Sequence, residues 1–176
     1  LKRMFDESEF LSDFGIRSLS KYHQDNPYKF AFDGGSMQVD YTPAESTGDM
    51  FGGNSNWRGP IWFPMNYLIL DSLSKFSDYY GSDYEVEYPT NSGQMMNIKD
   101  AASGVSKRLL AMFVPGKDGK IPMYGEYEKM QSDPNFKDKH LFFEYFDGDT
   151  GKGLGASHQT GWTGLISEII RQLYGK

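Results

Sequence analysis

The sequence contains no cysteine among its 176 residues. This absence excludes disulfide bonds, thiol catalysis and cysteine-based zinc sites, and it favours a reducing compartment, so we expect a cytoplasmic protein. No apolar run approaches the roughly 20 residues that a membrane-spanning helix needs. Lysine and arginine form no block and the formal net charge is −6, so nucleic acids and membranes are not expected partners.

Aliphatic residues are also scarce, because hydrophobic residues make up only 38% of the chain while aromatic residues alone reach 16%. This balance favours an aromatic cleft or surface over a thick aliphatic core. The 20 glycines and 8 prolines indicate long, shaped loops. The start, "LKRMFDESEF", lacks both an initiator methionine and an apolar signal-peptide core, which indicates a piece of a longer chain.

Helical periodicity predicts three helices, over about 64–80, 98–113 and 160–174. Pro64 suits a first helical turn, and Asn97 is a good N-cap for the second helix. The predicted apolar stripes are Met65, Ile69, Leu73, Phe76 and Tyr80 in the first helix, Ile98, Ala101, Val105, Leu109 and Met112 in the second, and Trp162, Leu165, Ile166, Ile169 and Leu173 in the third.

Long irregular segments separate these helices, at 22–63, 81–97 and 114–159. Loops of this length are often functional. The pieces "SMQVDY" and "HLFFEYF" suggest small hairpins, and "FLSDFGIRSLS" suits either a short helix or a turn. The chain is therefore predicted to be mainly α, with long loops and short hairpins that build the site.

Two of the three tryptophans lie five residues apart in "WRGPIW", around an Arg-Gly-Pro turn. A rigid turn could present Trp57 and Arg58 to a ligand, since tryptophan offers a broad apolar face and arginine a planar fork of donors. Sugars suit such a surface because their C–H faces stack on aromatic rings. The alternative places Trp57 and Trp62 in the core and pairs Arg58 with a structural carboxylate, and it is favoured for Trp62.

Glu144 lies among four aromatic residues in "FFEYF". Aromatic surroundings desolvate a carboxylate and prepare it for proton transfer. In an extended chain, Glu144 would share a face with Phe142 and Phe146, while Phe143 and Tyr145 would take the other. The alternative is an edge-strand glutamate that points at water.

Further polar residues flank these segments. His158 and Gln159 precede the third helix, where they could contact a hydroxyl group, although a capping role is slightly favoured for His158. Asp40 and Glu45 could line a site, but solvent exposure is the default for each. The stretch "DGDTGKGLG" lacks the ligand spacing of an EF-hand, so it is predicted to be a glycine-rich turn without a metal.

The stretches "GGNSNWRGPIWFPMNYLILDSL" and "FFEYFDGDTGKGLGASHQTGWTGLISEII" resemble the two hallmark segments of glycoside hydrolase family 63. The resemblance extends over nearly the whole chain, including "FLSDFGIRSLSKYH" and "VEYPTNSGQMMN", and it is strongest to the microbial branch, which includes α-glucosidases and mannosylglycerate hydrolases. The family acts on α-glucosides and related small glycosides or oligosaccharides.

The resemblance implies an (α/α)6 barrel, of which residues 1–176 would form the C-terminal portion as a single segment. It implies an inverting reaction with two carboxylic acids and no cofactor, in which Glu144 is the general base and an upstream Asp is the general acid. Trp57 and Arg58 match the segment that lines the sugar subsite, and Trp62 matches with a less defined role. Since the acid lies outside this chain, residues 1–176 alone are expected to be inactive and to need the rest of the barrel.

Two other classes remain open from the residues. A non-catalytic carbohydrate-binding module would use the same aromatic surface, and an upstream half-barrel in the parent gene would argue against it. A helical scaffold for protein contacts would not bind sugar, which calorimetry would reveal.

Overall fold

The computed structural model describes residues 1–48 and 56–175. Its longest elements are the helices α1 (Phe63–Tyr80), α2 (Ile98–Ala111) and α5 (Ile166–Tyr174), and shorter helices α3 and α4 span Glu128–Ser132 and Thr160–Thr163. Two 3-10 turns lie at Lys21–Gln24 and Pro122–Tyr124. About one third of the chain is helical and the strands are short, so long loops dominate, as predicted.

Helices α1 and α2 begin and end at the predicted signals. Pro64 lies in the first turn of α1, and Gly81 closes the helix with φ +76 and an N–H that donates to Ser77. Asn97 caps α2, because its side chain accepts a hydrogen bond from the N–H of Asp100. Local chemistry therefore sets the bounds of both helices.

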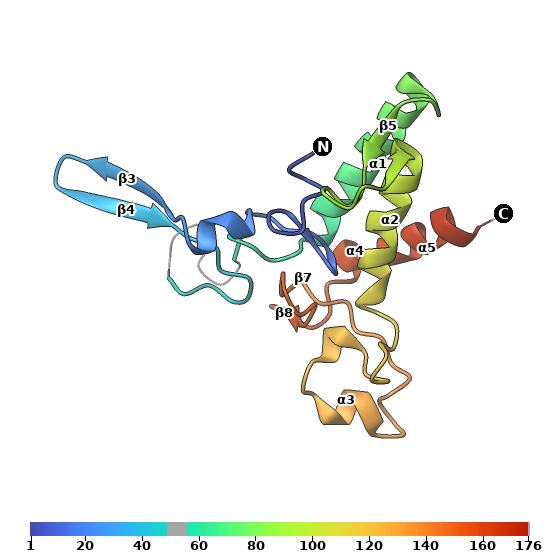
Figure 1. The fold of residues 1–176 in the computed structure, drawn as a ribbon. Coiled ribbons are helices and arrows are strands. Elements are labelled where there is room, and N and C mark those ends of the chain that lie inside the picture. Colours follow the sequence, from blue (N-terminus) through green and yellow to red (C-terminus); the bar gives the residue numbers. More distant parts are fainter. Residues whose placement is uncertain (49–55, 176) are drawn as a thin grey trace.

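Helix α2 lies against both α1 and α5, and all five residues of its predicted stripe are buried (Figure 1). The predicted stripe of α1 is confirmed for Leu73, which is buried, and Ile69 packs partly buried against the core. It is wrong for Met65, Phe76 and Tyr80, which are 48–50% exposed, and the other buried residues of α1 are Phe63, Asn66 and Leu70. Helix α1 carries apolar side chains on two faces, and periodicity does not tell which face meets α2.

The predicted third helix is broken into α4 and α5. The hydroxyl of Thr163 donates to the carbonyl of Phe143, and the N–H of Gly164 donates to Thr160 as α4 ends. This contact ties α4 to the segment before β7. The chain then restarts as α5, whose Ile166 and Ile169 are buried as predicted.

Three small antiparallel hairpins surround the helices. They are β1 (Leu11–Ser12) with β2 (Gly15–Ile16), β5 (Glu85–Glu87) with β6 (Met95–Asn97), and β7 (Tyr145–Phe146) with β8 (Gly153–Leu154). The stretch 10–20 is therefore a turn. "HLFFEYF" supplies only β7, and its partner strand lies in the glycine-rich stretch. Isolated backbone bridges of Ile61 to Arg17 and to Phe146 join the first and last of these hairpins.

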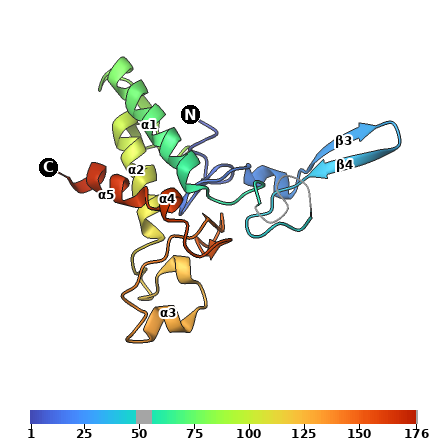
Figure 2. The same cartoon turned by 180° about the vertical axis from the view of Figure 1, so that it is seen from behind.

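A fourth hairpin, β3 (Tyr28–Phe32) with β4 (Gly35–Val39), projects away from the helices in both views (Figures 1 and 2). It contains most of "SMQVDY", as predicted, and none of its residues is buried. None of the described helices is long and apolar enough to cross a membrane.

Candidate active site

The tryptophans form a stack with one exposed end. The rings of Trp57 and Trp62 are parallel within 1°, with centroids 3.9 Å apart, and Tyr145 stacks on Trp62 at 4.8 Å. Trp162 meets the edge of Trp62 at 6.0 Å. Trp57 is 39% exposed, whereas Trp62 and Tyr145 are buried. The segment 57–62 and the segment after Glu144 thus build one aromatic platform, whose surface is Trp57.

Trp62 occupies the core position that the alternative interpretation gave it. Its indole Nε1–H donates to the carbonyl of Asn56 at 2.9 Å, which satisfies the buried donor. Because Trp62 is only 2% exposed, it supports Trp57 from behind. Sequence reasoning missed the participation of Tyr145 and Trp162, although both are aromatic residues inside the hallmark segments.

Arg58 is buried and holds two oxygens from the segment that precedes it. One terminal nitrogen donates to Asp40 at 3.1 Å, and the other donates to Thr47 at 3.2 Å. The pairing with Asp40 is the structural carboxylate contact of the alternative interpretation. Among the described residues, Nε of Arg58 has no hydrogen-bond partner. The predicted contact of Arg58 with a sugar stays a prediction.

Glu144 lies where the segment 142–146 pairs with the segment 153–159. Its N–H donates to the carbonyl of Ala156 at 2.9 Å, and its carboxylate oxygen Oε2 accepts the N–H of Ala156 at 3.0 Å. A Cβ on Gly155 would lie 2.6 Å from Oε2, so the carboxylate packs directly over this glycine. Glu144 is half-buried, its backbone is paired with Ala156, and the N–H of Ala156 orients its carboxylate.

The expected alternation around Glu144 is wrong. Phe143 and Phe146 both enter the core, where their rings meet edge to face at 6.3 Å. The chain bends at Glu144 before β7 begins, so neighbouring side chains do not alternate as they would in a regular strand. The bend separates the core phenylalanines from Tyr145, which joins the tryptophan stack.

Two carboxylates influence the phenol of Tyr145. Burial raises the pKa of Tyr145 above its ordinary value, and the negative charges of Glu45 and Glu144 raise it further. Glu45 also lines a cavity of about 690 Å³, together with Tyr127, Phe143 and Lys152.

His158 and Gln159 lie in the same loop cluster as Glu144. An isolated backbone β-bridge pairs His158 with Phe142, and the centroids of their rings are 5.5 Å apart. The N–H of Gln159 donates to the carbonyl of Phe142. Gln159 is the N-cap residue of α4 and its side chain makes no capping bond, so the favoured capping role of His158 is wrong. His158 is exposed and Gln159 half-exposed.

A second, mostly apolar cavity of about 400 Å³ opens beside the tryptophan stack. Trp57, Trp62, Met65 and Ile69 line it, and Arg17 supplies a charged group. No cluster of histidine and carboxylate side chains in residues 1–48 and 56–175 could hold a metal ion.

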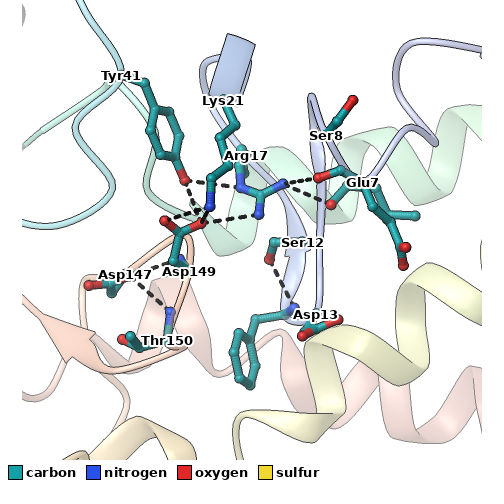
Figure 3. A network of polar contacts seen from close by, with 12 residues as sticks. Glu7, Ser8, Ser12, Asp13, Arg17, Lys21, Tyr41, Asp147, Asp149 and Thr150 are labelled. Atoms are coloured by element: carbon teal, nitrogen blue, oxygen red, sulfur yellow. Dashed lines mark hydrogen bonds and ion pairs between the residues drawn. The ribbon is translucent and has the colours of Figure 1, made fainter. Parts of the chain in front are cut away.

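In the turn between β7 and β8, Asp149 accepts hydrogen bonds from three side chains, in a network that sequence reasoning missed (Figure 3). Its Oδ1 accepts from Arg17 at 3.1 Å, from Tyr41 at 3.0 Å and from Lys21 at 3.2 Å. Burial opposes ionisation of Asp149, but the hydrogen bonds from Lys21 and Tyr41 and the charge of Arg17 outweigh it, so the pKa of Asp149 is lowered.

Asp147 shapes the same turn, because its Oδ1 accepts the N–H groups of Asp149 and Thr150 at 2.8 and 3.0 Å. Residues 147–152 thus form a hydrogen-bonded turn, as predicted, but the glycine-rich stretch continues as strand β8, which was not predicted. Arg17 and Asp149 lie 132 positions apart, so no local sequence pattern indicates this network.

Comparisons with known proteins agree with the hallmark segments. Residues 1–163 match the model of the mannosylglycerate hydrolase MGH1-like glycoside hydrolase domain. The chain belongs to this glycoside hydrolase family. The match, together with relatives named as glucosidases, confirms the predicted resemblance to glycoside hydrolase family 63.

The relatives are much longer than this chain. The chain is 52% identical over 172 residues to an uncharacterized protein of Saccharomyces cerevisiae. This match covers 97% of the chain and 16% of the yeast protein. It is 30% identical to a probable mannosyl-oligosaccharide glucosidase of Schizosaccharomyces pombe, over 99% of the chain and 15% of the relative. It is 27% identical to alpha-glucosidase 2 of Arabidopsis thaliana, over 67% of the chain and 11% of the relative.

Proposed function

We propose that residues 1–176 are a single segment of an inverting α-glycosidase, in which Glu144 is the general base and the general acid is an Asp upstream of this chain. The names of the relatives favour α-glucosidic bonds in an oligosaccharide or small glycoside, and α-mannosidic bonds are the alternative. The chemistry needs no metal and no organic cofactor. The protein is proposed to act in the cytoplasm.

One observation carries this proposal: Glu144 is held next to the aromatic platform. Tyr145, the residue after Glu144, is the buried end of the stack, and Trp57 is its exposed end. The N–H of Ala156 orients one carboxylate oxygen of Glu144, while the side chain keeps part of its exposure. In this proposal, a sugar that contacts the exposed part of Trp57 also reaches the carboxylate of Glu144.

In the proposed reaction, Glu144 removes a proton from a water molecule, and this water attacks the anomeric carbon on the face opposite the leaving group. The upstream Asp donates a proton to the leaving oxygen. Inverting enzymes place these two carboxyl groups roughly 6.5–9.5 Å apart, which leaves room for the water. Backbone anchoring of Glu144 suits this geometry because the base must stay at a fixed distance from the water.

Substrate binding is assigned mainly to Trp57, whose exposed ring offers an apolar face to the C–H side of a sugar. His158 and Gln159 lie near Phe142 and would supply hydroxyl contacts. Arg58, with an Nε that has no partner among the described residues, and Trp62 complete the proposed subsite, although both are buried in this structure.

The barrel architecture is also part of the proposal. The outward side of α1 carries large exposed apolar side chains, with Met65, Leu68, Phe76 and Tyr80 each about half exposed (48–56%). Exposed apolar patches of this kind mark surfaces that pack against other protein. Further helices of an (α/α)6 barrel would cover this face, and the greater length of the relatives agrees with that arrangement.

The test replaces Glu144 in the whole protein that carries this chain. Glu144→Gln keeps the size of the side chain but removes the base, so kcat on α-glucosides should fall by about 10²–10⁴-fold while substrate still binds. Glu85→Gln, at an exposed position on β5, is the matched control and should leave kcat unchanged. Proton NMR of early product should show the β anomer of the released sugar.

A Glu144→Gln variant with near-normal kcat would remove Glu144 from the mechanism and turn attention to Glu45 and Asp147. Early product with the α anomer would contradict inversion. Sugar binding without any turnover in the unaltered protein would instead favour a carbohydrate-binding module.

A further inference from the structure

Three segments that are remote in sequence lie side by side below the site. The N–H of Ser18 donates to the carbonyl of Pro60 at 3.1 Å, and Ile61 exchanges hydrogen bonds with Phe146 at 2.8 and 3.0 Å. The segment 16–18 therefore neighbours the segment 57–62, which in turn neighbours β7. The middle segment carries Trp57, and β7 begins one residue after Glu144.

The ion pair of Arg17 and Asp149 links the first and third of these segments. Arg17 is buried, and its guanidinium donates to Asp149 and to Tyr41 at 3.0 Å (Figure 3). It also donates to the carbonyl of Leu11 at 2.8 Å. Tyr41 in turn donates to Asp149. Asp149 lies in the turn between β7 and β8, so the pair fixes the hairpin that follows Glu144.

Tyr41 connects the same network to the segment of Trp57 and Arg58. The N–H of Thr42 donates to the carbonyl of Arg58 at 2.6 Å, and a Cβ on Gly59 would lie 2.7 Å from the ring of Tyr41. Tyr41 therefore packs directly on the turn that presents the platform. One residue thus contacts Asp149 with its hydroxyl and Gly59 with its ring.

The turn of Asp149 has no room to shift independently. The N–H of Gly148 donates to the carbonyl of Pro43 at 2.9 Å. A Cβ on Gly148 would lie 2.4 Å from the carbonyl oxygen of Gly59 and 3.0 Å from the hydroxyl of Tyr41. The turn and the platform segment are therefore in backbone contact.

We propose that Arg17, Tyr41 and Asp149 form a positioning network that sets the place of Glu144 relative to the sugar platform. The three residues act on Glu144 through the β7–β8 hairpin, whose turn contains Asp149. This inference rests on the proposed function, because it needs Glu144 to be the base. It assigns residues that lie outside the two hallmark segments, Arg17 and Tyr41, to the same reaction.

The expected consequence is a loss in kcat more than in substrate affinity. A general base works only when the water that it holds lies in line with the anomeric carbon, and a misplacement of about 1 Å can cost about 10²-fold. The platform residue Trp57 would still bind the sugar. Weakening the network should therefore lower kcat by roughly 10- to 100-fold and change KM by less than about 3-fold.

The experiment is a double-mutant cycle in the whole protein. Asp149→Asn removes the charge but keeps the size of the side chain, and Tyr41→Phe removes only the hydroxyl while its ring still packs on Gly59. Each change is made alone and together with Glu144→Gln, and kcat and KM are measured on the folded fraction. If the network acts through Glu144, either change should lower kcat in the unaltered protein and have little further effect in the Glu144→Gln background.

The control is Asp71→Asn, which breaks the exposed ion pair of Asp71 with Lys75 on α1 and should change neither constant. Tyr41→Phe keeps the test valid if Asp149→Asn fails to fold. Equal losses in both backgrounds would overturn the inference, because a general structural effect would then explain them. Unchanged kcat in Asp149→Asn and Tyr41→Phe would also overturn it, whereas a fully active Glu144→Gln would refute the proposed function itself.

Discussion

Truncating Trp57 should weaken substrate binding without unfolding the protein. Trp57 is the exposed end of a stack in which Trp62 and Tyr145 are buried, so Trp57→Ala removes the outer surface and leaves the inner tiers in place. A stacked aromatic pair contributes about 0.5–1.5 kcal/mol beyond its buried area. A loss of that size leaves a domain folded when its total stability is about 5–15 kcal/mol.

The cost for binding should be larger. Tryptophans at the centre of a recognition surface often cost about 2 kcal/mol when truncated, and about 1.4 kcal/mol corresponds to a tenfold change in affinity. Trp57→Ala should therefore raise KM about 10- to 30-fold, and Trp57→Phe, which keeps a smaller ring, should raise it about 3-fold.

Steady-state kinetics on an α-glucoside and calorimetry with an unreactive sugar measure this effect, and denaturant titration measures stability. Tyr79→Ala, at an aromatic residue on α1 that is 82% exposed, is the matched control and should leave KM unchanged. An unchanged KM in folded Trp57→Ala would refute the platform. Extensive unfolding with normal kinetics in the remaining folded protein would show that Trp57 is a structural residue.

Three further outcomes follow from the same contacts. Arg58→Lys should lower kcat/KM, because lysine cannot hold Asp40 and Thr47 with separate nitrogens of one fork, and a variant with unchanged kinetics would contradict this. Gly148→Ala should reduce the free energy of unfolding by about 1–3 kcal/mol in urea titration, because its Cβ would meet a backbone oxygen; equal stability would refute the close packing. Since the pKa of Asp149 is lowered, its ionised form stabilises the fold at neutral pH. That contribution is lost as pH falls below about 4, so Asp149→Asn should flatten the acid side of the stability profile.

The bounds of helices could be predicted because local chemistry sets them. Asn97 caps α2 through a hydrogen bond within its own first turn, and Gly81 closes α1 in a backbone conformation that glycine adopts easily. The buried face of α1 could not be predicted, since both faces are apolar and packing against α2 decides between them. The break after α4 depends on Thr163 reaching the carbonyl of Phe143, which is a tertiary contact.

In the candidate site, too, local features could be predicted from the sequence and tertiary contacts could not. The aromatic residues that flank Glu144 are evident from the sequence, but the bend that sends Phe143 and Phe146 into one core depends on pairing with the segment 153–159. The stacking of Trp57 on Trp62 depends on the turn between them. The network of Arg17 and Asp149 carries no pattern in the sequence, because its members are far apart and each is an ordinary charged residue by itself.

The position of Arg17 explains why a buried cation is tolerated beneath an aromatic platform. A buried guanidinium that lost its partners would be costly, often by about 3–5 kcal/mol when one member of a buried pair is removed. It donates to the carbonyls of Glu7, Glu9 and Leu11, to the hydroxyl of Tyr41 and to the carboxylate of Asp149, so three segments each supply acceptors for one rigid guanidinium. Because the fork is planar and its donors point in fixed directions, the three segments cannot shift separately without breaking a bond to the same charge. Apolar packing alone would hold these loops together, but it would not fix their relative positions, which is what a base beside a sugar platform requires.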